Sequence, residues 1–269
     1  MYLLWSGNKW QSQAELPNRG FRYGDGVFET IQLVDGQAPY LPDHLSRLTQ
    51  GLDFLFIRYH AEELHQTIGQ LCQRLPRTKH ATLRIWAYRQ GAGAYPPIHY
   101  DVELQAAWSD NPHFVAVRTG SIAVSKWVSL LASRDGQYKT MNSIPYIRAA
   151  EEAKQCHLLD VVIPNHLGNI AEASSSNIFV LREGVWLTPS LDQGCVSGIR
   201  RKVVLERMAT LGTPHQVQPI PVTYLFDCQG IVLTNSNQLK RVDRVDEQAI
   251  PLVSLSDLHT LFAMPIDTS

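Results

Sequence analysis

One lysine stands directly ahead of a predicted helix and strand in QYKTMNSIPYIRAAEEAKQCHLLDVVI, residues 137–163. Ser143 is a candidate N-cap of that helix, and Pro145 is tolerated in its first turn. The chain has seven lysines against seventeen arginines. Arginine stays protonated in proteins, whereas a desolvated lysine loses its proton and becomes a nucleophilic amine. Lys139 is therefore either an ordinary surface charge or a lysine that forms a Schiff base.

Strand-like and helix-like segments alternate on both sides of this stretch. Upstream, hydrophobic periodicity predicts a strand, two helices and a strand, at 27–34, 44–56, 61–75 and 81–89. Asp43 is a plausible N-cap of the first of these helices. Downstream, the patterns predict a strand, a hairpin around Glu183-Gly184, a helix and a last strand, at 159–165, 177–189, 197–211 and 230–236. Strands and helices mixed in both halves predict an α/β or α+β protein of two domains.

Composition narrows the class of protein. Of the 269 residues, 44% are hydrophobic, which suffices for real cores. The formal net charge of −1 argues against a nucleic-acid or membrane-surface protein. No stretch approaches the roughly 20 apolar residues of a membrane helix, and MYLLWSGNKWQ lacks the pattern of a signal peptide. The four cysteines are scattered, as in a reducing compartment. We expect a cytoplasmic enzyme.

Two further features bear on chemistry. GIRRK, residues 198–202, puts three cations in the first turn of a helix, where the dipole prefers anions. They form either a solvated face or a helix start whose backbone N–H groups bind a phosphate. Glu172 is either a turn carboxylate or an acid partner for a pyridine nitrogen, and the serines at 174–176 are a loop or hydrogen-bond donors around a cofactor. A Schiff-base lysine, a phosphate site and such a carboxylate together suggest pyridoxal phosphate.

Several segments together resemble the fold-type IV pyridoxal-phosphate enzymes, the class IV aminotransferase family. They are RYGDGVFET (22–30), HLSRL (44–48), YKTMN (138–142), NIAEASSSNIF (169–179), SGIRR (197–201) and LTNS (233–236). The resemblance implies a D-amino-acid aminotransferase-like fold with a smaller N-terminal α/β domain (1–118), an interdomain loop (119–135) and a larger C-terminal domain with a pseudo-barrel (136–269). It also implies a homodimer that acts on a small-molecule substrate. From the composition and the absence of a ligand motif we expect no nucleic acid, membrane or metal.

The resemblance assigns roles residue by residue. Lys139 matches the Schiff-base lysine, Glu172 the carboxylate on the pyridine nitrogen, and Arg47 the arginine that binds the cofactor phosphate. The other cofactor-binding matches are the helix-start donors Gly198 and Ile199, the phosphate-binding hydroxyl Ser236, and the lining serines Ser174, Ser175 and Ser176. Arg200 departs from the threonine of many relatives, so the resemblance leaves its role in phosphate binding open.

Three activities share this family, and the cofactor motifs barely separate them. The chain lacks the Arg-x-His pair of D-amino-acid aminotransferases after WAYR, and Thr30 replaces a glycine of branched-chain aminotransferases. Its length and Thr30 favour aminodeoxychorismate lyase, in which the Thr30 hydroxyl would assist proton delivery during pyruvate release in folate biosynthesis. Against this, the loop RQGAGAY offers a dianionic substrate only Arg89. We expect the lyase, with amino-acid transamination as the alternative.

Four other residues belong to weaker hypotheses. Lys240 and Arg241 either bind a substrate carboxylate or lie on the surface, and the surface is favoured. His60 and His65 are five apart, which does not place both on one helix face, so we expect surface histidines rather than metal ligands.

Overall fold

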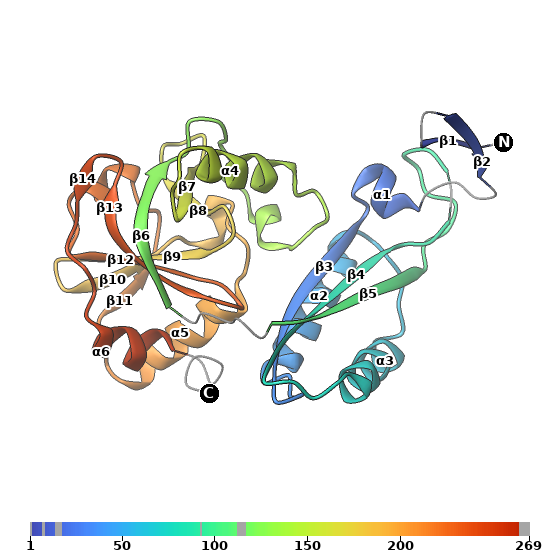
Figure 1. Ribbon diagram of the computed structural model, residues 1–269, viewed down its shortest axis with the longest axis horizontal. Coiled ribbons are helices and arrows are strands. Elements are labelled where there is room, and N and C mark those ends of the chain that lie inside the picture. Colours follow the sequence, from blue (N-terminus) through green and yellow to red (C-terminus); the bar gives the residue numbers. More distant parts are fainter. Residues whose placement is uncertain (1, 7–8, 14–17, 92, 112–116, 264–269) are drawn as a thin grey trace.

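The computed structural model describes residues 2–6, 9–13, 18–91, 93–111 and 117–263, with side chains placed from residue 18 onward. Two groups of elements lie side by side (Figure 1). The chain begins with a hairpin of β1 (Tyr2–Ser6) and β2 (Lys9–Gln13). The first group then consists of α1 (Arg19–Tyr23), β3 (Gly26–Val34), α2 (Leu41–Phe54), α3 (Ala61–Arg74), β4 (His80–Arg89) and β5 (Val102–Asp110). Apart from the β1–β2 hairpin, this group is a three-stranded antiparallel sheet, β3-β4-β5.

The three-stranded sheet and the helices α2 and α3 enclose the first core. Alternate residues of β3 and β4 meet the apolar stripes of the helices, including Leu48 and Leu52 of α2 and Ile68 of α3. The helix α2 begins two residues before Asp43, so the expectation that Asp43 is its N-cap is wrong. Tyr40 is the N-cap instead, and Pro42 and Asp43 both lie in the first turn.

The second group is built on a larger, curled sheet with short connections. Its elements are β6 (Val117–Val124), η1 (Arg134–Gln137), α4 (Ile144–Gln155), β7 (Asp160–Pro164), β8 (Ile170–Ala173), β9 (Asn177–Arg182), β10 (Val185–Thr188), η2 (Leu191–Gln193), α5 (Ile199–Thr210), β11 (His215–Val217), η3 (Val222–Phe226), β12 (Gly230–Thr234), β13 (Leu239–Val245), β14 (Gln248–Ala249), α6 (Leu255–Asp257) and η4 (Leu258–Phe262). In the described residues the sheet order is β11-β10-β9-β12-β13-β6-β7-β8, with β14 beside β13.

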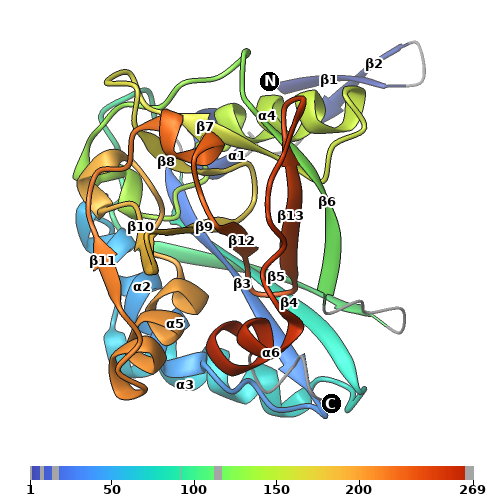
Figure 2. The same cartoon turned by 90° about the vertical axis from the view of Figure 1, so that its left-hand side faces the viewer.

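Helices cover this sheet at separate places. The helix α4 packs through Ala149 and Ala153 against Val161 and Ile163 of β7. Elsewhere on the same outer face of the curled sheet, α5 and η4 pack against Phe179 and Val232, whose neighbours Ile178 and Ile231 belong to the core inside the curl (Figures 1 and 2). The mixed α/β architecture and the curled sheet agree with the expected fold class.

Several strands differ from the segments expected downstream, among them the short strands β8, β11 and β14. Residues 119–124, within the expected interdomain loop, belong to β6, which pairs in parallel with β13 and β7. The sheet also continues past the expected last strand, because β13 follows β12. The domain limits themselves stay a prediction. Among the described residues, no helix combines the length and the apolar character needed to cross a bilayer.

Candidate active site around Lys139

The backbone around Lys139 joins the two groups of elements. The amide of Phe28 in β3 donates to the Lys139 carbonyl at 2.9 Å, and the amide of Met141 donates to the Gly26 carbonyl at 2.9 Å. These bonds use the free edge of β3, the outer strand of its sheet. The Lys139 Nζ lies 4.4 Å from the centre of the Phe28 ring. The lysine that opens the α4 segment is therefore held against β3 at the junction.

The environment of Lys139 favours its neutral amine. Burial lowers the pKa of Lys139, and the Arg47 guanidinium lowers it further. The carboxylates of Glu29 and Glu172 act in the opposite direction without reversing the shift. A lowered pKa makes the amine available as a nucleophile and as a base. An ordinary surface charge would have none of these neighbours.

Glu172 is a buried carboxylate with one oxygen in use. Oε1 accepts hydrogen bonds from the Tyr146 hydroxyl at 2.7 Å and from the Val196 amide at 3.2 Å. Oε2 accepts none from any residue that the structure describes. Burial raises the pKa of Glu172 to about 7 despite these donors and the nearby Lys139. The free oxygen is suited to a cationic N–H donor, which would stabilise the ionised carboxylate.

Tyr146 stays a hydrogen-bond donor to this carboxylate. Burial raises the pKa of the Tyr146 phenol well above its usual range, and the charge of Glu172 raises it further. The Tyr146 proton therefore remains on the phenol oxygen, and the Tyr146–Glu172 bond fixes which carboxylate oxygen is free.

Arg47 belongs to a buried charged group between β3 and α2. Its Nε and Nη2 donate to the two oxygens of Glu29 at 2.7 and 2.6 Å, a bidentate arrangement. The Nδ1 atom of His44, one turn before Arg47, lies 2.7 Å from Glu29 Oε2. Burial alone would raise the pKa of Glu29, but Arg47 and His44 outweigh it and lower that pKa to about 2. Glu29 is therefore ionised and keeps Arg47 in place.

Arg47 also contacts the segment that leads into α5. Its Nη1 donates to the Ser197 carbonyl at 2.8 Å, which leaves one N–H on each terminal nitrogen for another acceptor. The helix α5 begins at Ile199 with Gly198 as N-cap, without a capping side chain or a first-turn acid in the described chain. A Cβ at Gly198 would collide with the Asn177 side chain, so only glycine fits there. The uncapped N–H groups form an anion-binding feature next to Arg47.

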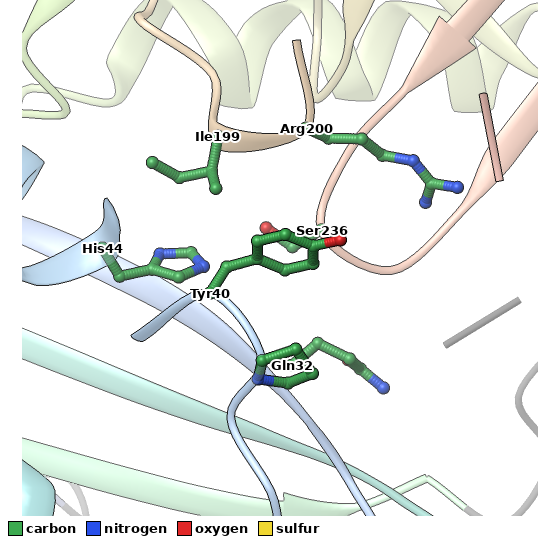
Figure 3. A pocket seen from close by; sticks show the side chains of 7 residues that line it. Gln32, Tyr40, His44, Ile199, Arg200 and Ser236 are labelled. Carbon is green, nitrogen blue, oxygen red and sulfur yellow. The ribbon is translucent and has the colours of Figure 1, made fainter. Parts of the chain in front are cut away.

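A small pocket adjoins the start of α5. Ile199 and Ser236 line it together with Tyr40 and His44 from the α2 side (Figure 3). The helix start, Ser236 and the α2 segment, far apart in the sequence, are thus neighbours. Glu172 bonds to Val196 and Arg47 bonds to Ser197, the two residues that lead into this helix start. The charges of both Glu172 and Arg47 act on the pKa of Lys139.

The cations of GIRRK do not form the solvated face. Arg200 is buried, and its guanidinium donates to the carbonyls of Phe262 and Asn235, which ties the start of α5 to η4 and to the turn after β12. Arg201 is also buried and donates to the Pro189 carbonyl at 2.8 Å. Only Lys202 is exposed, where it pairs with Asp43. Burial of two arginines leaves the face of α5 toward Arg47 to its backbone.

The serine turn between β8 and β9 corrects another expectation. Ser174 and Ser176 are buried, whereas Ser175 is exposed. Lys240, expected on the surface, is 5% exposed and donates to Ser176 Oγ at 3.1 Å and to Asp160 Oδ2 at 2.7 Å. The surface interpretation of Lys240 is therefore wrong, because a buried carboxylate compensates its charge. Arg241, the next residue, is half-buried.

Thr30 has a side chain that could contact a substrate, whereas the side chain of Arg89 is engaged within the protein. Thr30 follows Phe28 by two residues on β3, so both side chains lie on one face of the sheet, and no described residue bonds to the Thr30 hydroxyl. The Arg89 guanidinium is used by Asp25 at 3.0 Å and by the carbonyls of Phe56 and Leu55. Arg89 therefore does not serve as a free cation for a substrate. The histidines His60 and His65 are exposed, as expected.

Sequence reasoning missed Glu29, His44, Tyr146 and Asp160. A usable signal existed for His44, which precedes Arg47 by three residues and so shares its helix face. Tyr146 and Asp160 gave no such signal, since each finds its partner through the tertiary fold.

Comparisons with known proteins identify the family. The family model for amino-transferase class IV matches residues 26–242. An aminodeoxychorismate lyase from Vibrio harveyi is 24% identical, with 87% of this chain and 88% of the relative covered. A probable branched-chain-amino-acid aminotransferase from Synechocystis is 25% identical (84% and 77% covered), and a D-alanine aminotransferase from Listeria monocytogenes is 25% identical (82% and 78% covered).

Solved structures share the fold. A branched-chain aminotransferase from Thermoproteus uzoniensis with norvaline has a TM-score of 0.82 at 21% identity, covering 94% of this chain and 90% of its own. A T.th. branched-chain amino acid aminotransferase complexed with N-(5'-phosphopyridoxyl)-L-glutamate has a TM-score of 0.80 at 21% identity (92% and 87% covered). A 4-amino-4-deoxychorismate lyase from Pseudomonas aeruginosa has a TM-score of 0.78 at 22% identity (93% and 96% covered).

The matched range includes Lys139, Glu172 and Arg47, and it spans both sheets. The expected fold-type IV architecture is confirmed by these structural relatives. The chain belongs to the class IV aminotransferase family of pyridoxal-phosphate-dependent enzymes.

Proposed function

We propose that this chain binds pyridoxal phosphate and releases pyruvate and p-aminobenzoate from 4-amino-4-deoxychorismate. The observation that carries the cofactor assignment is the lowered pKa of Lys139, whose charged neighbours include Glu172 and Arg47. Glu172 has an oxygen without a donor among the described residues, and Arg47 has N–H groups left for another acceptor. The uncapped start of α5 supplies a third feature that fits the phosphate. Thr30 and the lyase relatives favour the elimination.

The donor set fits the cofactor at both ends. Arg47, the amides of Gly198 and Ile199, and the hydroxyl of Ser236 would hold the phosphate. Oε2 of Glu172 would accept the pyridine N–H, and Ser175 would line the ring. When bound, the cofactor supplies an electron sink for the carbon that bears the substrate amine.

Protons move through two side chains in this proposal. The neutral Nζ of Lys139 takes the proton from the carbon that bears the substrate amine, which requires the lowered pKa described above. The Thr30 hydroxyl, without a hydrogen-bond partner among the described residues, assists delivery of a proton to the departing pyruvate group.

Two measurements test the proposal. Borohydride reduction of the yellow protein, followed by peptide mapping, is expected to place the cofactor on Lys139; a label on another lysine rules out that assignment. Purified enzyme is then expected to release p-aminobenzoate and pyruvate from aminodeoxychorismate without any keto acid. An enzyme that retains the cofactor but leaves this substrate unchanged contradicts the lyase assignment alone.

Amino-acid transamination is the second candidate. It is favoured by the engagement of Arg89, which leaves the loop after β4 without a free cation for a dianionic substrate in the described residues. Relatives named as branched-chain and D-alanine aminotransferases match about as well as the lyase. Bleaching of the yellow form by a branched-chain or D-amino acid, and its recovery with 2-oxoglutarate or pyruvate, would identify this activity.

We also propose that the chain acts as a homodimer in the cytoplasm. Ile144 and Ile147, neighbours on one face of α4, are 63% and 61% exposed, which supports an apolar contact with a second copy. All four cysteines are unpaired, in agreement with a reducing compartment. Light scattering during size-exclusion chromatography is expected to give twice the mass of the 30.3 kDa chain. The monomer mass for the holoenzyme would rule out the dimer.

A further inference from the structure

A buried ion pair joins two strands of the curled sheet. Asp160 begins β7 and Lys240 lies in β13, with β6 between the two strands. The Lys240 Nζ lies 2.7 Å from Asp160 Oδ2, and the two side chains are 6% and 1% exposed. Val162 and Val242, each two residues further along the same strand and so on the same side, belong to the apolar core inside the curled sheet. The pair therefore borders that core.

The pair contacts every residue of the serine turn. Asp160 Oδ1 accepts from the Ser174 amide at 3.0 Å and the Ser174 hydroxyl at 2.5 Å, and Oδ2 accepts from Ser176 Oγ at 3.2 Å. Lys240 Nζ donates to Ser176 Oγ at 3.1 Å and to Ser175 Oγ at 3.4 Å. The ammonium and the carboxylate thus fix the backbone and the hydroxyls of the turn together.

Burying this ion pair costs desolvation free energy, which a turn held by neutral hydrogen bonds would not cost. Desolvating each charge of a buried pair costs several kcal/mol, and apolar replacements of similar volume often match or exceed the stability of such pairs. A buried, fully hydrogen-bonded network is instead suited to fixing one geometry. The turn begins two residues after Glu172, and its central residue Ser175 keeps an exposed side chain.

We propose that Lys240 and Asp160 are positioning residues that hold the serine turn, and through it Glu172 and Ser175, in the geometry that binds the cofactor. This inference rests on the proposed binding of pyridoxal phosphate. Neither residue touches the reacting atoms, so both act through the turn. The pair joins β7 to β13 and thereby links the position of the turn to the curl of the sheet.

The experiment compares Lys240→Met, Asp160→Asn and the double variant by two separate measurements. One is the dissociation constant of pyridoxal phosphate for folded apoprotein, from absorbance titration together with the visible spectrum of the bound cofactor. The other is the thermal unfolding of the apoprotein. Lys154→Met is the matched control, because its ammonium is 80% exposed on α4 and forms only a 4.0 Å pair with Glu151.

Each single variant leaves one buried charge without its partner, so both the unfolding temperature and the cofactor affinity are expected to fall. The double variant removes both charges, so its unfolding temperature is expected to recover. Its affinity is expected to stay roughly 10-fold or more below wild type, as for outer-shell partners of metal ligands, because the Lys240 bonds to Ser175 and Ser176 are still missing. Lys154→Met is expected to change neither quantity.

Wild-type affinity and an unchanged spectrum in the double variant would overturn the inference, because the pair would then only stabilise the fold. Wild-type affinity in a folded Lys240→Met protein would overturn it as well. A wild-type protein that binds no pyridoxal phosphate would instead overturn the proposed function, and the positioning role with it. The two failures are therefore distinguishable.

Discussion

The Tyr146 hydroxyl donates to Oε1 of Glu172 at 2.7 Å and leaves Oε2 without a donor in the described part of the chain. One bond thereby selects the oxygen that is available for a ligand. The same bond favours the charged carboxylate, since it lowers the pKa of Glu172 against the stronger effect of burial.

Tyr146→Phe tests this relationship directly. A hydrogen bond to a charged group contributes about 1.5–3 kcal/mol, so its loss is expected to lower turnover roughly tenfold or more. The pKa of Glu172 should rise further, because one of the groups that lower it is gone. Steady-state kinetics and the pH dependence of the cofactor spectrum report both effects. Tyr59→Phe, which loses a 2.9 Å bond to Asp53, is the control, and equal behaviour of the two variants would contradict the prediction.

Glu172 also predicts how the stability of the apoprotein depends on pH. Folding raises the pKa of Glu172 from 4.5 to about 7, so the folded state binds this proton more tightly than the unfolded state. The contribution is fully present below pH 4.5 and is lost as the pH rises to about 7. The shift corresponds to about 3 kcal/mol. Urea unfolding of the apoprotein between pH 4.5 and 8 measures this loss, and Glu172→Gln should abolish it; an unchanged slope in that variant would show another group to be responsible.

Much of the site was predictable from sequence because its residues lie in contiguous motifs. Arg47 lies within a predicted helix and Lys139 just before one, whereas Glu172 lies in β8, a short strand that was not predicted. The alternating patterns of β4 and β9 located two of the surrounding strands. The prediction that Asp43 caps α2 was wrong, because the helix begins two residues earlier with a proline in its first turn and no side-chain cap.

The strand β13 was not predicted, since LKRVDRV is interrupted by charges. Its burial pattern alternates only once Lys240 is counted as an inward residue, and that requires Asp160, which is 80 positions away. Likewise, the two buried arginines of α5 find carbonyl acceptors only in the folded chain. Local patterns do not encode such compensation, so charges that are buried and paired are taken for surface charges.

Arg47→Ala is expected to affect both stability and cofactor binding. It leaves the buried Glu29 carboxyl without its bidentate partner, and breaking such a buried pair costs about 3–5 kcal/mol. Weaker phosphate binding should raise the cofactor dissociation constant more than it lowers turnover at saturating pyridoxal phosphate. Chemical denaturation and cofactor titration measure the two effects. Arg58→Ala removes an exposed pair with Asp101 and serves as the control. A folded Arg47→Ala protein that excess cofactor never reactivates would assign Arg47 another role.

Thr30→Val separates the two candidate reactions. Valine keeps the β-branched shape and removes a hydroxyl that no described residue bonds, so stability should change by less than about 0.5 kcal/mol. Positioned proton transfer contributes about 10²–10⁴ in rate, so release of pyruvate from aminodeoxychorismate should slow at least about tenfold. Cofactor affinity should stay the same, since Thr30 is not among the groups assigned to the phosphate or the pyridine nitrogen. Thr119→Val on β6, an exposed threonine, is the matched control.

If both variants eliminate pyruvate at the wild-type rate, Thr30 delivers no proton. If wild type instead exchanges amino groups with a keto acid and Thr30→Val does so equally well, the chain is a transaminase, and the threonine was a misleading basis for choosing the lyase.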